Sequence, residues 1–365
     1  MTTPLKLAPL LLALSASALS ALAPFANADD FSAAFSRYQQ AWSAGHNAEA
    51  RSHAETAYQL GEAKFGKDSL DYANLGLNLA KALRSDNSGD IEADRKRAAE
   101  IASMSVASYE ARFGKEATNL IEPLMVLGDV TQDSKTAKDA YQRALEIAED
   151  SGKDELLAIT RLNAFKRLAS TEFYNATVYG YIKDAHEYLA AKHPANSTLR
   201  LEATYLLASA YLGNGKYGKA EPLFLEVIEQ YKVLNYSHPF ALGAHSRLVQ
   251  VYEKLGERDK STEHCIAIGS MKPWDDNQQQ LPLFRKEPDY PIELAKRGKS
   301  GWAELSFTVD EMGMVREPKI LKSAGGKAFE KASLEALSAW RFAPKFEDGK
   351  PVKGESTVRL DFMIH

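Results

Sequence analysis

The spacing of apolar residues divides the chain into two parts. Between Phe31 and Gly269, apolar positions recur with helical spacing and few prolines interrupt them. After residue 300, apolar and polar residues alternate with a period of two, as in Ala303, Leu305 and Phe307. The first part therefore predicts helices, and the second predicts strands.

The helical part repeats itself. Small or aromatic residues at positions i, i+4 and i+7 recur with starts 39 to 48 residues apart. The triplets are Ala50-Ala54-Ala57, Ala98-Ala102-Ser105, Ala137-Tyr141-Ala144, Tyr181-Ala185-Tyr188, Ala220-Phe224-Val227 and Ser261-Cys265-Ile268. A period of this length with two helices per unit is typical of an α-solenoid, in which neighbouring pairs share one core. The pattern resembles the longer tetratricopeptide (TPR) repeats of the kinesin light chain type, which implies five or six units over residues 31–270.

A solenoid of this kind binds other proteins, and the sequence does not name the partner. We expect the first helix of each unit to line the concave face. Polar and aromatic candidates on those helices are Asn74, Asn78, Arg161, Asn163, Arg200, Tyr205, His245 and Arg247. The alternative, a solvated helix face without a ligand, stays open for each of them.

After this region the predicted secondary structure changes from helices to a linker followed mainly by strands. Residues 271–285 combine prolines, acids and glutamines without an apolar period, which predicts an extended linker. The following pattern is strand, strand, helix, strand, with strands at 301–309, 314–323 and 353–364. We therefore predict an α+β multidomain protein, in which an all-α solenoid precedes a small β-β-α-β domain at 286–365.

Several short motifs of the last part occur in a fixed order. They are Glu287–Pro291 (EPDYP), the turn Val309-Asp310-x-x-Gly313-x-Val315, the step Ser323-Ala324-Gly325 and the run Trp340-Arg341-Phe342-Ala343-Pro344. With these motifs, the domain resembles the C-terminal domain of TonB, the periplasmic energy transducer of Gram-negative bacteria.

The resemblance implies a peptide-binding edge. In TonB-like domains a segment of an outer-membrane receptor, the TonB box, adds to the last strand as a further strand, and main-chain hydrogen bonds supply the affinity. On this chain the edge maps onto Ser356, Thr357, Val358, Arg359, Leu360 and Asp361, with a further contact at Glu287, Asp289 and Tyr290. The acids Glu287 and Asp289 replace amides common in the family, so a partner would need complementary positive charge.

The N-terminus has the pattern of an export signal. Lys6 is followed by an apolar stretch, and Ala26-Asn27-Ala28 is a small-x-small cleavage site. We therefore expect residues 1–28 to be a signal peptide cleaved after Ala28, and the mature protein to be periplasmic. No cysteine lies near the site, so we expect no lipid anchor. An uncleaved inner-membrane anchor is the alternative.

The amino-acid composition argues against several functions, namely nucleic-acid binding, metal binding and catalysis. The formal net charge of −4 over 365 residues gives no basic field for nucleic acid. One cysteine excludes a disulfide framework, and the eight histidines lack metal-ligand spacing. With no catalytic motif, we expect a non-enzymatic protein without metal or cofactor. Three functions stay open: an adaptor for TonB-dependent transport, an envelope scaffold without energy transduction, and an anchored energy transducer.

Overall fold

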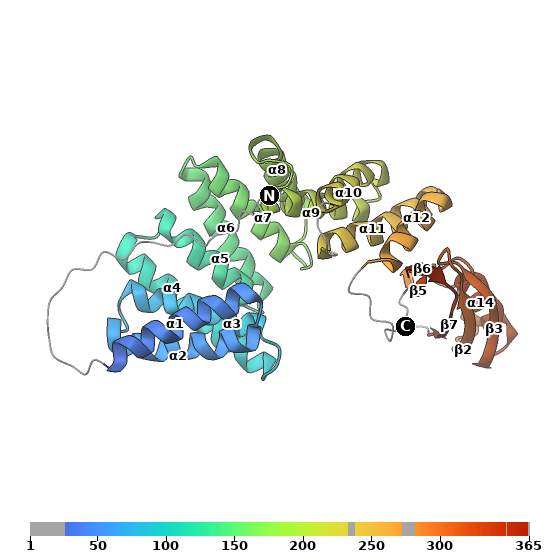
Figure 1. Cartoon of the computed structure of the whole chain (residues 1–365), viewed down its shortest axis with the longest axis horizontal. Coiled ribbons are helices and arrows are strands. Elements are labelled where there is room, and N and C mark those ends of the chain that lie inside the picture. Colours follow the sequence, from blue (N-terminus) through green and yellow to red (C-terminus); the bar gives the residue numbers. More distant parts are fainter. Residues whose placement is uncertain (1–25, 233–237, 272–281, 348, 364–365) are drawn as a thin grey trace. The chain divides into compact units, whose positions relative to one another are not determined.

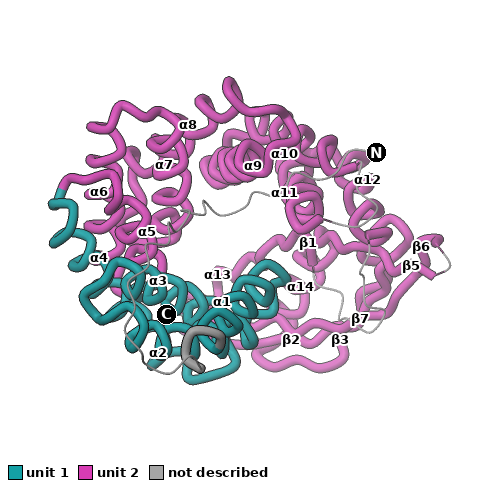
Figure 2. Tube along the Cα trace, turned by 60° about the vertical axis from the view of Figure 1, so that its left-hand side comes forward, with its two compact units in different colours: residues 1–115, 130–132 teal, residues 116–129, 133–365 magenta. Residues whose placement is uncertain are grey.

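A computed structural model describes residues 26–232, 238–271, 282–347 and 349–363. The expected signal peptide lies outside the described residues except for its last three positions. The chain forms two compact units, which Figure 2 colours separately. One unit comprises the residues up to 115 together with 130–132, and the other comprises 116–129 and the residues from 133 onward. In the part of the chain described, no helix is both long and apolar enough to cross a membrane.

The first unit contains four helices, each packed on the next in sequence. They are α1 (Ala26–Ala44), α2 (Asn47–Phe65), α3 (Leu70–Ser85) and α4 (Ile91–Phe113). Asp90 caps α4, because its side chain accepts a hydrogen bond from the Ala93 backbone N–H. The buried Ser105 hydroxyl donates to the Ala73 carbonyl at 2.9 Å, so a small residue on α4 allows a close approach to α3.

The second unit continues the series of helices (Figure 1). They are the 3₁₀ turn η1 (Thr118–Leu120), α5 (Ile121–Val130), α6 (Ser134–Asp150), α7 (Asp154–Leu168), α8 (Ala176–Lys192), α9 (Thr198–Gly213), α10 (Tyr217–Tyr231), α11 (Pro239–Leu255) and α12 (Arg258–Gly269). From α6 to α12 each helix packs against its successor. All six predicted triplets fall on even-numbered helices, so each repeat is a pair of helices and the predicted all-α repeat region is confirmed.

One predicted triplet has the wrong phase. Tyr181 and Tyr188 on α8 are only half-buried, whereas Val178, Ile182 and Ala185 are buried. Both the predicted set and the observed set have i, i+4, i+7 spacing and share Ala185. Periodicity alone therefore could not choose between them, and packing against α7 and α9 selects the row with aliphatic side chains.

The C-terminal domain is a three-stranded antiparallel sheet with one helix on it. Its strands lie in the order β3-β2-β7, and α14 packs against β2 and β3. The bounds are β2 (Gly301–Val309), β3 (Val315–Ala324), α14 (Lys327–Leu337) and β7 (Gly354–Phe362). The core between helix and sheet contains Leu305, Phe307, Phe329, Trp340 and Phe362. The predicted β-β-α-β order is confirmed.

Short elements not expected from the sequence surround this sheet. They are β1 (Pro282–Phe284), α13 (Ile292–Ala295), β4 (Arg341–Phe342), β5 (Lys345–Glu347) and β6 (Lys350–Val352). Strand β1 pairs with β4, although its residues fall within the expected linker. Leu283 and Phe284 pack against an apolar cluster that includes Val249 and Ala343, which explains the ordered strand there. The rest of the expected linker, 272–281, lies outside the described residues.

Candidate functional site

Strand β7 lies at an edge of the sheet. It pairs only with β2 among the described strands, over an unbroken register from Gly301↔Phe362 to Val309↔Gly354. The strand has nine residues and contains no proline. Its outer side therefore offers a regular row of backbone donors and acceptors to a further strand.

The opposite edge, β3, is unsuited to pairing. Pro318 lacks a backbone N–H, and Glu317 next to it has a left-handed backbone with φ of 48°. The register with β2 shifts twice along β3, as expected for the bulge that Pro318 predicts. Exposed Lys319 and Lys322 add charge along this edge, a common protection against strand addition. The two edges of the sheet thus differ in their ability to pair with a further strand: β7 is regular, whereas β3 is interrupted.

The six predicted edge residues lie together on β7 and alternate between two faces. Leu360 is buried and Val358 half-buried against the core, whereas Thr357, Arg359 and Asp361 are exposed. The Arg359 Nε lies 3.0 Å from Asp361 Oδ1. Its guanidinium also stacks 4.1 Å from the ring centroid of Trp302 on β2. Ser356 is half-buried on the core-facing side.

The second predicted group reaches β7 through one residue. The Tyr290 ring packs edge-on against Phe362, with centroids 5.7 Å apart, and its hydroxyl donates to the Lys299 carbonyl at 2.6 Å. Glu287 and Asp289 are exposed, and neither forms a hydrogen bond or ion pair within the described residues. Tyr290 therefore packs against the end of β7, whereas Glu287 and Asp289, which precede it in the sequence, are exposed and make no such contact.

The turn between β2 and β3 is held by Asp310. Its carboxylate accepts from the backbone N–H groups of Met312 and Met314 and from the Arg316 Nε at 2.7 Å. Burial acts to raise the pKa of Asp310, but these hydrogen bonds outweigh it and hold the pKa below its usual value. Gly313 in the same turn has a φ of 75°, and a Cβ there would lie 2.1 Å from the Phe342 carbonyl oxygen.

A buried ion pair connects the domain to the last helical pair. Arg341 on β4 and Glu253 on α11 lie 3.0 Å apart, and their side chains are 4% and 5% exposed. Arg341 also donates to the Thr262 hydroxyl on α12. The sequence motif contained Arg341 but did not reveal this role; the signal was a charged residue between Trp340 and Phe342, which are both core residues.

An apolar cluster surrounds this ion pair. It contains Val249 on α11, Cys265 and Ile268 on α12, and Ala343 of the domain. Burial raises the pKa of the Cys265 thiol to about 11, so the thiol stays protonated at neutral pH. Among the described elements, the domain is therefore packed on α11 and α12 through β1, β4 and Ala343, and not through the sheet that contains β7.

Comparisons with known proteins agree with this architecture. The family described as Gram-negative bacterial TonB protein C-terminal matches residues 286–364. The chain is 30% identical to the protein TonB of Pseudomonas aeruginosa over 83 residues, which cover 23% of this chain and 24% of that protein. It is 31% identical to the protein TonB of Vibrio cholerae over 78 residues, 21% of this chain and 32% of that protein.

The helical region resembles a solved structure of different length. A putative kinesin light chain from Podosopora anserina with nearly identical TPR-like repeats is 18% identical, with a TM-score of 0.30, covering 65% of this chain and 90% of that chain. The chain spans only about a quarter to a third of the two curated TonB proteins it matches. Residues 286–364 are a TonB C-terminal domain, and in this protein that domain follows a series of TPR-like helical pairs.

Proposed function

We propose that the TonB-like domain binds an extended segment of an outer-membrane receptor on β7, and that the helical pairs bind a second protein in the periplasm. The protein would then serve TonB-dependent transport as an adaptor. The observation that carries this proposal is the contrast between the two edges. β7 is regular and free of proline, whereas Pro318 and a bulge protect β3.

The binding mode is strand addition. An added strand would continue the ladder that β2 and β7 form, and its backbone would supply most of the affinity. Its side chains would alternate between the row containing Val358 and the row containing Thr357, Arg359 and Asp361. Since the second row carries one positive and one negative charge, the charge pattern of the receptor segment would influence selectivity. The exposed acids Glu287 and Asp289 favour a segment with a basic residue at the Tyr290 end.

The location belongs to the same proposal. The N-terminal pattern supports export and cleavage after Ala28, and the alternatives are an envelope scaffold and an anchored transducer. N-terminal sequencing of the exported protein distinguishes the anchor, because a mature chain beginning at Asp29 is incompatible with it.

Strand addition is tested by disulfide trapping on the exported full chain. Cys265 is buried with a raised pKa, so an introduced surface cysteine is the reactive one. Thr357→Cys places it on β7, and Lys322→Cys is the matched control on β3. The probe is a set of TonB-box peptides in which one cysteine moves along the sequence.

The expected result is cross-linking to Thr357→Cys that alternates along the peptide with a period of two, since alternate side chains of a strand share a face. Lys322→Cys should cross-link weakly and without a period. Equal cross-linking at both edges, or no periodicity at Thr357→Cys, would refute receptor docking on β7 and leave the scaffold function.

A further inference from the structure

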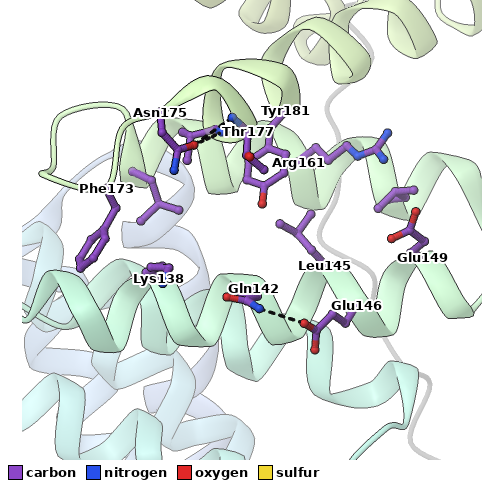
Figure 3. A pocket seen from close by; sticks show the side chains of 13 residues that line it. Lys138, Gln142, Leu145, Glu146, Glu149, Arg161, Phe173, Asn175, Thr177 and Tyr181 are labelled. Atoms are coloured by element: carbon purple, nitrogen blue, oxygen red, sulfur yellow. Dashed lines mark hydrogen bonds between the residues drawn. The ribbon is translucent and has the colours of Figure 1, made fainter.

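A groove lies between α6 and α8, above α7. It has a volume of about 480 Å³, and its lining residues all belong to the second unit. Figure 3 shows Lys138, Gln142 and Glu146 in succession along α6, with Asn175, Thr177 and Tyr181 across the groove. The groove is thus lined by the second helices of two repeats and by the first helix α7 between them, which contributes Arg161, one of the binding candidates from the sequence.

Leu145, Leu168 and Val178 are buried beneath the groove, so its exposed apolar surface comes mainly from the half-buried Leu157, Phe173 and Tyr181. The aliphatic residues of the groove come from all three helices and are Leu145, Leu157, Leu168 and Val178. Phe173, in the connection between α7 and α8, and Tyr181 add aromatic surface. Tyr181 is available here because α8 buries the row of Val178 and Ile182 instead. This volume and lining suit large apolar side chains of a ligand.

The two cations of the groove are already engaged. Lys138 Nζ lies 5.2 Å from the centroid of the Phe173 ring. Arg161 Nη1 lies 3.3 Å from the Asp184 carboxylate on α8. Lys138 keeps its positive charge in this contact but lies eleven positions from Glu149 along α6, whereas the charge of Arg161 is balanced by Asp184.

The two acids of the groove are available. Glu146 and Glu149 stand one turn apart on α6 and are exposed, and neither forms an ion pair within the described residues. Glu146 accepts a hydrogen bond from Gln142 Nε2 at 3.1 Å. Both acids also act on Tyr181: burial is the main cause of its raised pKa, and their negative charge adds to it against the opposing charge of Arg161. At the end of the groove where Glu146 and Glu149 lie, the charge that no ion pair among the described residues compensates is therefore negative, and it lies beside the Tyr181 ring.

We infer that this groove binds a short peptide segment of a protein partner, in which large apolar side chains are followed by a lysine or arginine. The apolar side chains would lie against the half-buried Leu157, Phe173 and Tyr181. The basic side chain would pair with Glu146 or Glu149 and lie against the ring of Tyr181, where ion pairing and a cation–π contact act together.

The length of the groove agrees with a short segment. Lys138 and Glu149 are eleven positions apart on α6, which corresponds to roughly 16 Å at about 1.5 Å per residue. An extended peptide covers this distance with about five residues. The inference deepens the solenoid half of the proposed function, and it does not depend on strand addition at β7.

The test uses the exported full chain and fluorescent synthetic peptides of defined composition. One peptide combines leucines with two arginines, a second has glutamates in place of the arginines, and a third has serines in place of the leucines. Each is titrated against the native chain, the variant E146Q/E149Q and the control D139N/D150N. The control removes the same charge from α6 at exposed positions that do not line the groove.

The leucine–arginine peptide should bind the native chain and the control equally, and E146Q/E149Q should bind it about fivefold to tenfold more weakly, as expected for two partly exposed ion pairs. The glutamate and serine peptides should bind far more weakly. Equal affinity of native chain and E146Q/E149Q, a preference for the glutamate peptide, or no binding by any peptide would overturn the inference. Cross-linking at Thr357→Cys is measured in parallel, so a failure of the groove is distinguishable from a failure of β7.

Discussion

The ion pair between Arg341 and Glu253 should decide whether the TonB-like domain stays packed on α11 and α12. The perturbation is Glu253→Leu, which leaves the Arg341 guanidinium buried without its carboxylate. An arginine cannot relieve this by losing its proton, since it stays charged at any accessible pH. With both side chains about 95% buried, loss of one partner should cost about 3–5 kcal/mol.

The magnitude follows from the burial of the pair. At about 1.4 kcal/mol per factor of ten, a loss of 3–5 kcal/mol raises the population with the domain undocked by about 10²- to 4 × 10³-fold. The reciprocal change Arg341→Met should be similarly costly. The double variant should recover to within about 1 kcal/mol of the native chain, because an apolar pair of similar size avoids the desolvation penalty.

The protein contains its own reporter for this opening. Cys265 is its single cysteine and is buried between Val249, Ile268 and Ala343. A Cβ on Gly313 of the domain would lie 3.2 Å from the Cys265 Cβ, so this thiol becomes accessible when the domain separates from α12. The assay is the rate of thiol labelling in native buffer, with hydrogen exchange of β7 as a second measurement.

Glu253→Leu should label about 10²- to 4 × 10³-fold faster than the native chain, and the double variant should label close to the native rate. Glu263→Leu is the control, since it removes an exposed acid of α12 that forms no ion pair among the described residues. If Glu253→Leu labels no faster than this control, the ion pair does not hold the domain and our reasoning is wrong.

Two further predictions concern the same unit. Gly313→Ala should destabilise the domain by about 2 kcal/mol or more, because φ is 75° and the new Cβ would meet the Phe342 carbonyl. Gly349→Ala is the control and should cost only about 1 kcal/mol, because φ is 74° but no atom of the described residues lies within 4 Å of its Cβ position. Similar stability losses of the two variants in thermal unfolding would contradict the close approach at Gly313. His245 and His264 share a hydrogen bond between their Nδ1 atoms at 2.7 Å. Burial is the main cause that lowers the pKa of each histidine to about 4, and the charge of His264 contributes to the lowered pKa of His245. Since the unfolded chain binds protons more readily, stability should fall as the pH drops from about 6.5 towards 4, by about 2 kcal/mol or less per histidine at pH 5. Urea unfolding of H245N/H264N should lack this part of the loss, and an identical pH slope in both chains would refute the assignment.

The sequence was informative wherever local spacing decides the structure. The apolar triplets predicted pairs of helices, and the alternation from Gly301 predicted the strands of the sheet, because amphipathic periodicity follows from backbone geometry alone. Pro318 indicates an edge strand or a bulge, since proline lacks a backbone donor, and β3 has both features. The sequence also grouped Thr357, Arg359 and Asp361 on one strand.

The sequence misplaced or missed features that depend on contacts between distant residues. It placed Tyr181 in the repeating triplet of α8, whereas the buried row is Val178, Ile182 and Ala185, because the two rows share Ala185 and have the same spacing. It treated residues 282–284 as linker, because the surface that orders Leu283 and Phe284 is formed by α11, α12 and β4.

The sequence by itself determined the order of elements in this protein: helical pairs, then two strands, a helix and a last strand. The reason is that the spacing of apolar residues within each helix or strand depends only on the local backbone geometry of that element. Only the tertiary structure decided that Arg341 pairs with Glu253 across 88 positions, and that α6, α7 and α8 line a groove whose two acids form no ion pair among the described residues. These features arise from packing between residues far apart in the chain, where the partner of a buried charge or the phase of a helix depends on what surrounds it.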